Sequence, residues 1–367
     1  MIYLDNGATS LHKPASVSRA MLLALETCAN PGRGGHPAAM AAMRTVFQCR
    51  QRAAAMFDSD PEQVIFTANC THGLNIAIRT LVKPGSRVVI SGFEHNAVTR
   101  PLHRLNARIT MAGRQLFDWE NILEDFEKAL QKGVDAAIFT HVSNVFGYIL
   151  PVEDLAALCK RYTVPFIVDA AQSAGMLPVK LKSWGADFIA MPGHKGLLGP
   201  QGTGILLCGR QPEPILMGGT GSNSRQQSMP EELPDRLEAG TLNVPGIAGL
   251  EAGIGYVSAV GAERIFRREQ RQAEYLAAGL RDMGVKVFAG PHQGGTVSFV
   301  PPGDCEEFAA ELSRHGIAVR AGLHCAPAAH ESAGTLASGT VRVSFGHDAT
   351  PRQTHRFLQT AKTLLKM

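Results

Sequence analysis

The stretch Met191-Pro192-Gly193-His194-Lys195-Gly196-Leu197-Leu198-Gly199-Pro200 holds a lysine between glycines, and two apolar runs enclose it at residues 187–190 and 204–208. This pattern predicts a tight loop between two buried strands, where desolvation lowers the pKa of an amine. Lys195 in that setting can form a Schiff base with an aldehyde. A lysine considered by itself is more often a solvated loop residue, so the rest of the chain must decide between the two interpretations.

Length, composition and charge indicate a globular protein and exclude several other classes of protein. The 367 residues, 45% of them hydrophobic, suffice for a sizeable core and two domains. A net charge of +4 is too small and too dispersed to indicate nucleic-acid binding. No run approaches the ~18 apolar residues of a membrane span, and the start of the chain lacks signal-peptide features. We therefore expect a cytoplasmic protein that binds neither membrane nor nucleic acid.

The seven cysteines are scattered and form no CxxC pair. In a reducing compartment this distribution favours free thiols over disulfides. Most of them are expected to be small core residues. The cysteine and histidine positions also lack the spacing of zinc ligands, so no metal site is predicted.

Apolar strand-like runs alternate with helix-like segments over the first 250 residues, which is typical of an α/β fold with parallel strands buried on both faces. Expected helices lie at 14–28, 38–57, 69–81, 119–133 and 151–161, and expected strands at 63–67, 87–91, 135–141, 164–168, 187–190 and 204–208. Residues 209–245, rich in glycine, serine and proline, predict a long functional or interface loop.

The last third of the chain has a different pattern. A long helical stretch follows residue 250, and strands are expected at 285–288, 296–299 and 340–345 with helices at 306–315 and 351–366. We expect a large domain at residues 13–250 and a smaller α+β domain made of residues 1–12 and 251–367.

Polar residues fall repeatedly at the ends of the expected strands. Asp169, Asn144, His95 and Lys195 each follow one strand, and Thr71 opens the helix after another. Ligands of parallel sheets bind beyond the carboxyl ends of the strands, and the helix start favours a phosphate. Taken singly, an aspartate there is more often a helix cap and a histidine more often structural. Five such residues at one edge of the sheet favour a ligand-binding site over five separate structural roles.

Together these residues describe a pocket for pyridoxal 5′-phosphate. Lys195 supplies the Schiff-base amine, and Asp169 pairs with the pyridine nitrogen so that the ring can accept electrons. His95 is placed to stack on the ring face. Gln172 and Asn144 can reach the ring substituents.

A resemblance to a known family rests on six segments that occur in this order: Asp5–Ser10, Thr67–Asn75, Glu94–Asn96, His141–Asn144, Val168–Gln172 and Gly193–Lys195. In them the chain resembles class V aminotransferase-fold enzymes, and it looks like a cysteine desulfurase. The resemblance implies the PLP-dependent transferase (aspartate aminotransferase-like) fold, with a mainly parallel seven-stranded sheet in the large domain. It implies cofactor contacts from Cys70, Thr71, His95, Asn144, Asp169, Gln172, His194, Lys195 and Thr241.

The segment Val319–Pro327 carries the argument for the reaction. It places Cys325 on a glycine-containing turn beside His324 and near Arg320, and positive neighbours stabilise a thiolate. The alternative is a small apolar cysteine in a turn. The resemblance, to an Arg-x-Gly-x-His-Cys element, implies that Cys325 attacks the substrate sulfur and becomes a persulfide.

The resemblance also implies the residues that bind the substrate. Arg342 matches the arginine that grips the substrate carboxylate, a task suited to a guanidinium fork. His36, Asn144 and Arg320 are expected on the substrate side. The chain between Cys325 and Arg342 is short, as in the compact type of desulfurase.

Residues 238–241 resemble the element that reaches the cofactor phosphate of a neighbouring subunit, which implies a homodimer with a shared active site. Three positions depart from the family pattern. Pro192 and Cys70 stand where hydroxyl residues are usual, which concerns cofactor affinity, and residues 345–350 depart after the arginine strand, which concerns substrate choice.

The predicted reaction converts L-cysteine to L-alanine and leaves a persulfide on Cys325 for an acceptor protein. Three alternatives stay open: a selenocysteine lyase, a transamination in which Cys325 is incidental, and a cofactor-free scaffold that binds a sulfur-trafficking partner. A zinc–thiol enzyme is disfavoured by the ligand spacing. The sequence does not name the acceptor, nor choose between iron–sulfur cluster assembly, tRNA thiolation and cofactor synthesis as the destination of the sulfur.

Overall fold

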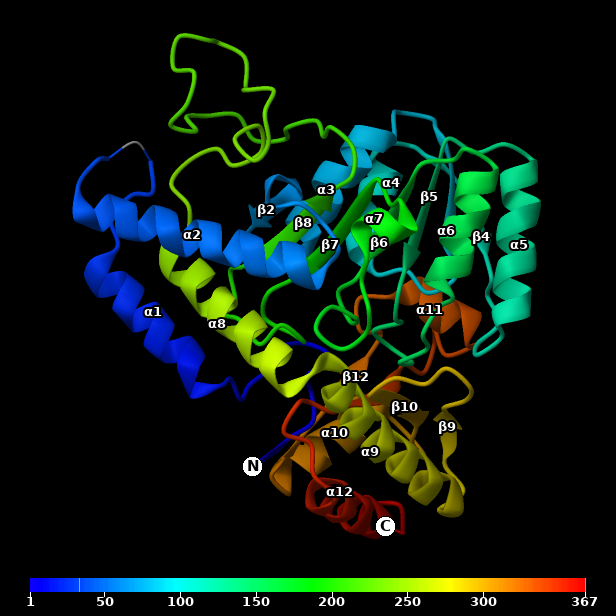
Figure 1. Ribbon diagram of the computed structural model, residues 1–367. Coiled ribbons are helices and arrows are strands. Elements are labelled where there is room, and N and C mark those ends of the chain that lie inside the picture. Colours follow the sequence, from blue (N-terminus) through cyan, green and yellow to red (C-terminus); the bar gives the residue numbers. More distant parts are fainter. Residues whose placement is uncertain (33, 367) are drawn as a thin grey trace.

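The computed structural model describes residues 1–32 and 34–366, and its centre is a seven-stranded sheet in the order β2-β8-β7-β6-β5-β3-β4 (Figure 1). The strands are β2 (Val64–Thr67), β3 (Arg87–Ser91), β4 (Arg108–Ala112), β5 (Ala136–Thr140), β6 (Phe166–Asp169), β7 (Phe188–Pro192) and β8 (Gly204–Cys208). Only β8 runs antiparallel to its neighbours. The predicted α/β fold with a mainly parallel seven-stranded sheet is confirmed.

Helices cover both faces of this sheet, so the central strands are apolar on both sides. Ile189 and Met191 belong to the core beneath one set of helices, whereas Phe188 and Ala190 belong to the core beneath the other. This explains the continuous apolar runs of the sequence. The helices of this part are α1 (Ala15–Thr27), α2 (Pro37–Met56), α3 (Cys70–Leu81), α4 (Asn96–Arg104), α5 (Trp119–Gln131), α6 (Val152–Arg161) and α7 (Leu181–Trp184), with a 3-10 turn at Pro61–Gln63.

The C-terminal part builds a separate four-stranded antiparallel sheet in the order β12-β13-β10-β9. Its strands are β9 (Lys286–Phe288), β10 (Thr296–Val300), β12 (Arg320–Gly322) and β13 (Thr340–Ser344), and its helices are α10 (Cys305–Arg314), α11 (Pro327–Ser332) and α12 (Pro351–Leu364). The N-terminal strand β1 (Ile2–Tyr3) pairs in parallel with β11 (Ile317–Ala318). The first residues of the chain therefore join the C-terminal part.

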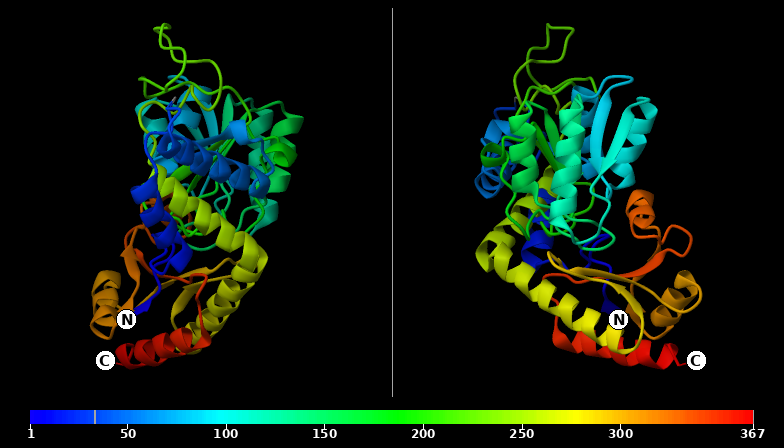
Figure 2. Two further views of the ribbon diagram at one scale, coloured as in Figure 1. Left: turned by 60° about the vertical axis from the view of Figure 1, so that its left-hand side comes forward. Right: turned by 90° about the vertical axis from the view of Figure 1, so that its right-hand side faces the viewer.

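Two helices connect the two parts. Helix α8 (Val244–Val260) packs against α1 and α2 of the large part, α9 (Ala262–Asp282) packs on the small sheet, and the two helices meet at an angle of 79° (Figure 2). The bend falls at Gly261, whose φ of 92° suits glycine. The predicted domain boundary at residue 250 lies inside α8, and the domain limits stay a prediction.

In the described residues no single helix has the length and apolar character to span a membrane, and only the bent pair α8–α9 meets those criteria jointly. Residues 209–243 contain no helix or strand and project from the body as a long loop (Figure 1).

The structure also contains elements that the sequence pattern did not indicate. Helix α4 and strand β4 lie between the strand and helix predicted at 87–91 and 119–133, and α11 and β12 flank Cys325. Helix α4 has a proline at position 101, and β4 is exposed along most of its length. A proline inside a helix and an exposed strand both disturb the regular spacing of apolar residues from which helices and strands are predicted.

Candidate active site

A cavity of about 190 Å³ lies at the carboxyl ends of the central strands, where the small sheet approaches the large one. Parallel sheets bind ligands at this edge. Its lining contains twelve of the predicted and discussed residues: Cys70, Thr71, His95, Asn144, Asp169, Gln172, Pro192, His194, Lys195, Arg320, Cys325 and Arg342.

Lys195 lies in the predicted loop between β7 and β8. The flanking glycines are required, because a Cβ at Gly193 would lie 2.1 Å from Thr203 Oγ1 and one at Gly196 would lie 2.4 Å from the carbonyl oxygen of Ala174. Within residues 1–32 and 34–366 the Lys195 amine makes no hydrogen bond or ion pair. Desolvation lowers the pKa of Lys195, and the positive charge of Arg342 lowers it further.

Asp169 is the last residue of β6, and one of its two carboxylate oxygens accepts hydrogen bonds from other residues of the protein. Its Oδ1 accepts hydrogen bonds from the Ala171 N–H at 2.9 Å and from Cys70 Sγ at 3.5 Å. Among the described residues Oδ2 has no donor, so it is available to a ligand in the cavity. Desolvation and the Asp169 carboxylate raise the pKa of Cys70, which keeps this thiol protonated.

The N-terminus of α3 opens into the same cavity. The Asn69 side chain caps the helix by accepting from the His72 N–H at 2.9 Å. The N–H groups of Cys70 and Thr71 have no acceptor in the described part of the chain. Two free N–H groups at the start of a twelve-residue helix, next to the Thr71 hydroxyl, make a cradle for a phosphate.

His95 caps α4, and its ring Nδ1 accepts from the Ala97 N–H at 3.0 Å. Desolvation lowers the pKa of His95, so the ring is neutral at neutral pH. The neighbouring Glu94 is buried and accepts from the Ser91 hydroxyl and from the Thr140 N–H. Burial raises the pKa of Glu94 to about 8, so a neutral carboxyl group ties β3 to β5 beneath the histidine.

The two residues that were expected to reach the ring substituents both donate hydrogen bonds to backbone carbonyl oxygens of the protein. Asn144 donates from Nδ2 to the carbonyl oxygen of His324 at 2.8 Å, and Gln172 donates from Nε2 to the Gly7 carbonyl oxygen at 3.0 Å. The Asn144 bond connects the end of β5 directly to the loop of Cys325. His194 lines the cavity and its Nδ1 lies 3.0 Å from Thr9 Oγ1, which fixes the ring beside Lys195.

Cys325 is exposed on a strained turn. Its φ is 57° and that of His324 is 49°, two consecutive non-glycine residues in the left-handed region, while Gly322 has a φ of 97°. The turn is held because the Asn96 N–H donates to the Cys325 carbonyl oxygen at 2.8 Å. Cys325 on this turn is exposed and also lines the cavity.

The expectation that His324 is a positive neighbour of Cys325 is wrong. His324 is buried, and its Nε2 lies 3.1 Å from the Thr340 carbonyl oxygen, so this nitrogen carries the ring proton. Its Nδ1 has no partner. Burial lowers the pKa of His324 to about 2, so of the two neighbours predicted to be positive only the exposed Arg320 carries a charge.

Arg342 projects from β13 into the cavity and is almost completely buried. It donates to Asp5 Oδ1 at 2.7 Å and to the carbonyl oxygen of Asn144 at 2.9 Å. Its Nε has no partner. Asp5 belongs to a sequence motif without a predicted role, because only the pairing of β1 with the C-terminal part brings it to Arg342.

His36 and Thr241 do not line this cavity. His36 caps α2 with its ring Nδ1, and Thr241 lines a separate cavity of about 600 Å³ between α2 and the loop at residues 219–242. Beneath that cavity Glu238 forms a buried ion pair with Arg50 and accepts from the Phe66 N–H at 2.7 Å. The pair anchors the loop that carries Thr241.

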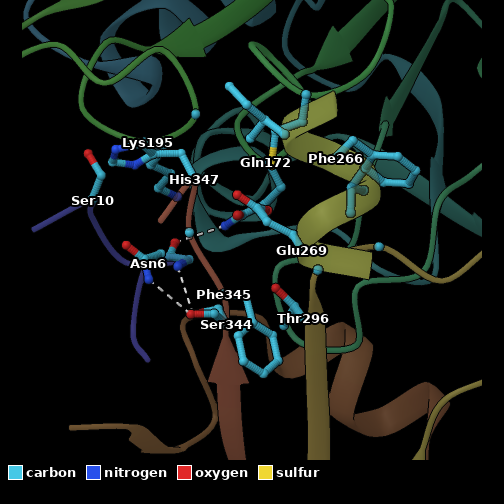
Figure 3. A pocket seen from close by; sticks show the side chains of 18 of the residues that line it. Asn6, Ser10, Gln172, Lys195, Phe266, Glu269, Thr296, Ser344, Phe345 and His347 are labelled. Atoms are coloured by element: carbon cyan, nitrogen blue, oxygen red, sulfur yellow. Dashed lines mark hydrogen bonds between the residues drawn. The ribbon is translucent and has the colours of Figure 1, made fainter. Parts of the chain in front are cut away.

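A smaller cavity of about 40 Å³ lies on the other side of Lys195 and Gln172, against α9 (Figure 3). Glu269 reaches into it from α9 and is buried. Burial raises the pKa of Glu269 well above its usual range, which favours the protonated form of this carboxyl group at the junction of the two parts.

The donor set at the main cavity fits pyridoxal 5′-phosphate. An amine without a partner can bond to an aldehyde carbon, a free carboxylate oxygen can face a pyridine nitrogen, and two free N–H groups at a helix start can hold a phosphate. Pro192 and Cys70 offer no hydroxyl there, as the sequence indicated.

Comparison with known proteins gives a consistent result. The family model Aminotransferase class-V matches residues 2–357. A probable cysteine desulfurase of Pyrococcus abyssi is 34% identical, with 100% of this chain and 94% of that protein covered. One of Methanothermobacter thermautotrophicus is 32% identical, with 100% and 95% covered. The apo structure of the cysteine desulfurase from Thermococcus onnurineus has a TM-score of 0.90 at 35% identity and covers 100% of this chain and 94% of its own.

Proposed function

The chain belongs to the class-V aminotransferase family, among the cysteine desulfurases, and we propose that it converts L-cysteine to L-alanine and leaves the sulfur as a persulfide on Cys325. The observation that carries this proposal is the position of an exposed cysteine at the mouth of a cavity that contains a desolvated lysine. A transamination does not require the cysteine, and a binding scaffold does not require the lysine.

Pyridoxal 5′-phosphate, which the family uses, supplies when bound an electron-withdrawing ring that stabilises negative charge at the substrate α-carbon. We propose that the N-terminus of α3 and Asp169 would hold it and that His95, which lines the same cavity, would contact its ring. Lys195 removes the α-proton of the substrate, a role that its lowered pKa favours because an unprotonated amine accepts a proton readily.

The sulfur step involves only the substrate and Cys325. The Cys325 thiol loses its proton and its sulfur bonds to the substrate sulfur, the substrate carbon–sulfur bond breaks, and the electron pair of that bond stays with carbon. A proton then completes the methyl group of alanine, and the proton that Lys195 removed returns to the α-carbon, so two protons are lost and two are gained. The exposed position of Cys325 leaves the product persulfide accessible to an acceptor.

Arg342 is the group proposed to bind the substrate carboxylate. It now bonds Asp5 and the Asn144 carbonyl, and its Nε is unpaired. A substrate carboxylate can use the free Nε and compete with Asp5 for the guanidinium group. Arg320, exposed at the mouth, adds positive charge on the path of entry.

We also propose a homodimer that shares its active sites, and we place the chain in the cytoplasm, consistent with seven free thiols. The support for the dimer is an apolar surface on α1 and α2, where Leu22, Leu23 and Leu25 are 59%, 60% and 65% exposed and Phe47 is 51% exposed. Such a surface is unusual on a monomer. Thr241 lines the cavity beside it, so a second subunit can bring Thr241, and His36 from the start of α2, toward its neighbour's site.

The deciding experiment uses purified protein with pyridoxal 5′-phosphate. We expect visible absorbance of the bound cofactor and, after addition of L-cysteine and dithiothreitol, equal amounts of sulfide and alanine. A colourless protein that cannot be reconstituted contradicts the proposal, and so does colour without sulfide. Turnover of L-selenocysteine about 100-fold faster than of L-cysteine would assign the chain as a selenocysteine lyase instead.

The dimer is tested separately by light scattering. We expect twice the chain mass for the wild type and a shift toward the monomer for Phe47→Asp, with Leu336→Asp, at an exposed leucine of the C-terminal part, as the control. A monomeric wild type with fully bound cofactor contradicts the shared site.

A further inference from the structure

A second, wider depression of about 390 Å³ continues from the active-site mouth along α3 and α4. We call it the arginine groove. It is lined by residues 71, 75 and 79 on α3, by residues 95–97, 100, 101, 104 and 105 on and beside α4, and by Cys325. Thr71, His95, Ala97 and Cys325 line both this groove and the active-site cavity. A molecule in the groove therefore lies directly beside the proposed persulfide.

The groove has a uniform positive charge. Arg79, Arg100 and Arg104 line it and are exposed. In residues 1–32 and 34–366 none of the three forms an ion pair, and no carboxylate is among the groove-lining residues. Three unpaired guanidinium groups at one surface depression are a site for several carboxylates or another polyanion.

Two of the three arginines, Arg100 and Arg104, form a line on α4 that leads toward the cysteine. Positions 96, 100 and 104 are spaced by four and so lie on one face of α4, and the Asn96 N–H binds the Cys325 carbonyl oxygen. At 1.5 Å per residue the line extends about 12 Å from Asn96 to Arg104. This is the length of about four extended residues, too short for the broad basic surface of a nucleic-acid site.

The groove also has apolar parts, because Ala97, Pro101 and Leu105 contribute to its lining. Mixed carboxylate and apolar contacts suit a polypeptide better than they suit a sugar–phosphate chain. Resting on the proposed desulfurase function, we propose that the arginine groove docks an acidic segment of the sulfur-acceptor protein, with the acceptor thiol beside Cys325.

The transfer that this docking serves is balanced within the two partners. The acceptor thiolate bonds to the outer sulfur of the Cys325 persulfide, the sulfur–sulfur bond at Cys325 breaks, and Cys325 leaves with the electron pair. The step needs no further reagent. Docking holds the acceptor sulfur near Cys325, which raises the rate of this step over transfer to a free thiol.

The test uses three seven-residue peptides, each with a central cysteine, flanked on both sides by three glutamates, three lysines or three serines. Persulfide formation on each peptide is followed by mass spectrometry. We expect transfer to the glutamate peptide to be about tenfold faster than to the lysine peptide at low salt, and the preference to vanish at about 0.5 M salt.

The groove variant is Arg79→Glu/Arg100→Glu/Arg104→Glu, with the milder glutamine triple as a safeguard for folding. The control, Arg271→Glu/Arg352→Glu/Arg356→Glu, makes the same charge change on α9 and α12 at exposed arginines. We expect the groove variant to lose or reverse the peptide preference while its alanine formation with dithiothreitol changes much less. The control should keep both properties.

Equal rates for the acidic and basic peptides in the wild type overturn the proposal, as does an unchanged preference in the groove variant. An RNA hairpin that blocks transfer in the wild type but not in the groove variant, without any acidic-peptide preference, also overturns it. Binding of the glutamate peptide with serine in place of cysteine, measured by fluorescence anisotropy, tests the groove without activity. If alanine formation is absent but this binding needs the arginines, the proposed reaction fails and the groove stands.

Discussion

The loop of Lys195 and the loop of Cys325 face the same cavity but are built in opposite ways. Lys195 lies between two strands that are buried along their whole length, in a loop whose glycines approach neighbouring atoms too closely for any Cβ. Cys325 lies on an exposed turn with two left-handed residues, held by bonds from Asn96 and Asn144. Proton abstraction needs a desolvated amine, whereas sulfur delivery needs an accessible thiol.

The largest effect is expected from Lys195→Ala, which removes the amine of the buried loop. Alanine formation should fall by on the order of 10⁴-fold, because one residue carries both the cofactor bond and the proton transfer. The visible absorbance of bound cofactor should disappear. Lys132→Ala, at an exposed loop lysine, should leave both unchanged. Retained absorbance and activity in Lys195→Ala would falsify the assignment.

Cys325→Ser removes only the thiol of the exposed turn. We expect it to keep the cofactor absorbance and to lose sulfide formation by at least about 100-fold, because a hydroxyl is a far weaker nucleophile toward sulfur. Cys28→Ser, at a partly buried cysteine of α1's end, is the matched control. Full activity of Cys325→Ser with L-cysteine would show that the two loops do not divide the chemistry in this way.

Glu94→Gln tests whether burial changes the protonation of a carboxyl group near the cavity, through the pH dependence of the unfolding free energy. In the unfolded chain Glu94 ionises near pH 4.5, but in the folded protein it keeps its proton to about pH 8. The proton that Glu94 retains favours the folded state at low pH, and this stability is lost as pH rises from 4.5 to 8. Glutamine does not titrate, so the variant should gain relative stability over that window, on the order of 4 kcal/mol at pH 7.5.

Urea unfolding between pH 4 and 9 measures this difference. The exposed Glu120→Gln on α5 should show no such pH-dependent gain. A Glu94→Gln variant whose relative stability does not change with pH would mean that Glu94 is ionised in the folded protein.

The smallest effect is expected at the start of the Cys325 turn. Gly322→Ala places a Cβ at a φ of 97°, which should cost about 1 kcal/mol or more of unfolding free energy. Sulfur transfer should slow with little change in cofactor absorbance. Gly219→Ala, at a glycine with open space and no positive φ, is the control. Equal unfolding midpoints for both variants would argue against strain in the turn.

The local pattern of apolar residues predicted most of the helices and strands, because a long apolar run or a clear helical period is a strong indication of secondary structure. The apolar runs at 87–91 and 204–208 became β3 and β8 with their predicted bounds, since strands buried on both faces leave a continuous apolar run. The bounds of α4 and β4 could not be predicted in the same way, because one contains a proline and the other is exposed.

At the site, the residue types at strand ends predicted the cavity lining, from Asp169 to Lys195. Their actual partners were not predictable. Asn144 bonds the Cys325 loop, His324 is neutral, and Asp5 holds Arg342, because each state depends on burial or on a contact between residues far apart in the chain.

The sequence by itself therefore determined the parallel sheet, the family and the residue types that line the cavity, since these follow from local apolar periods and from motifs within short segments. Tertiary structure alone decided which groups are desolvated, which carbonyls hold the strained turn, and that three arginines of α3 and α4 line one groove beside Cys325. The physical reason is that desolvation and charge summation depend on distances in space, which the order of residues along a chain does not contain.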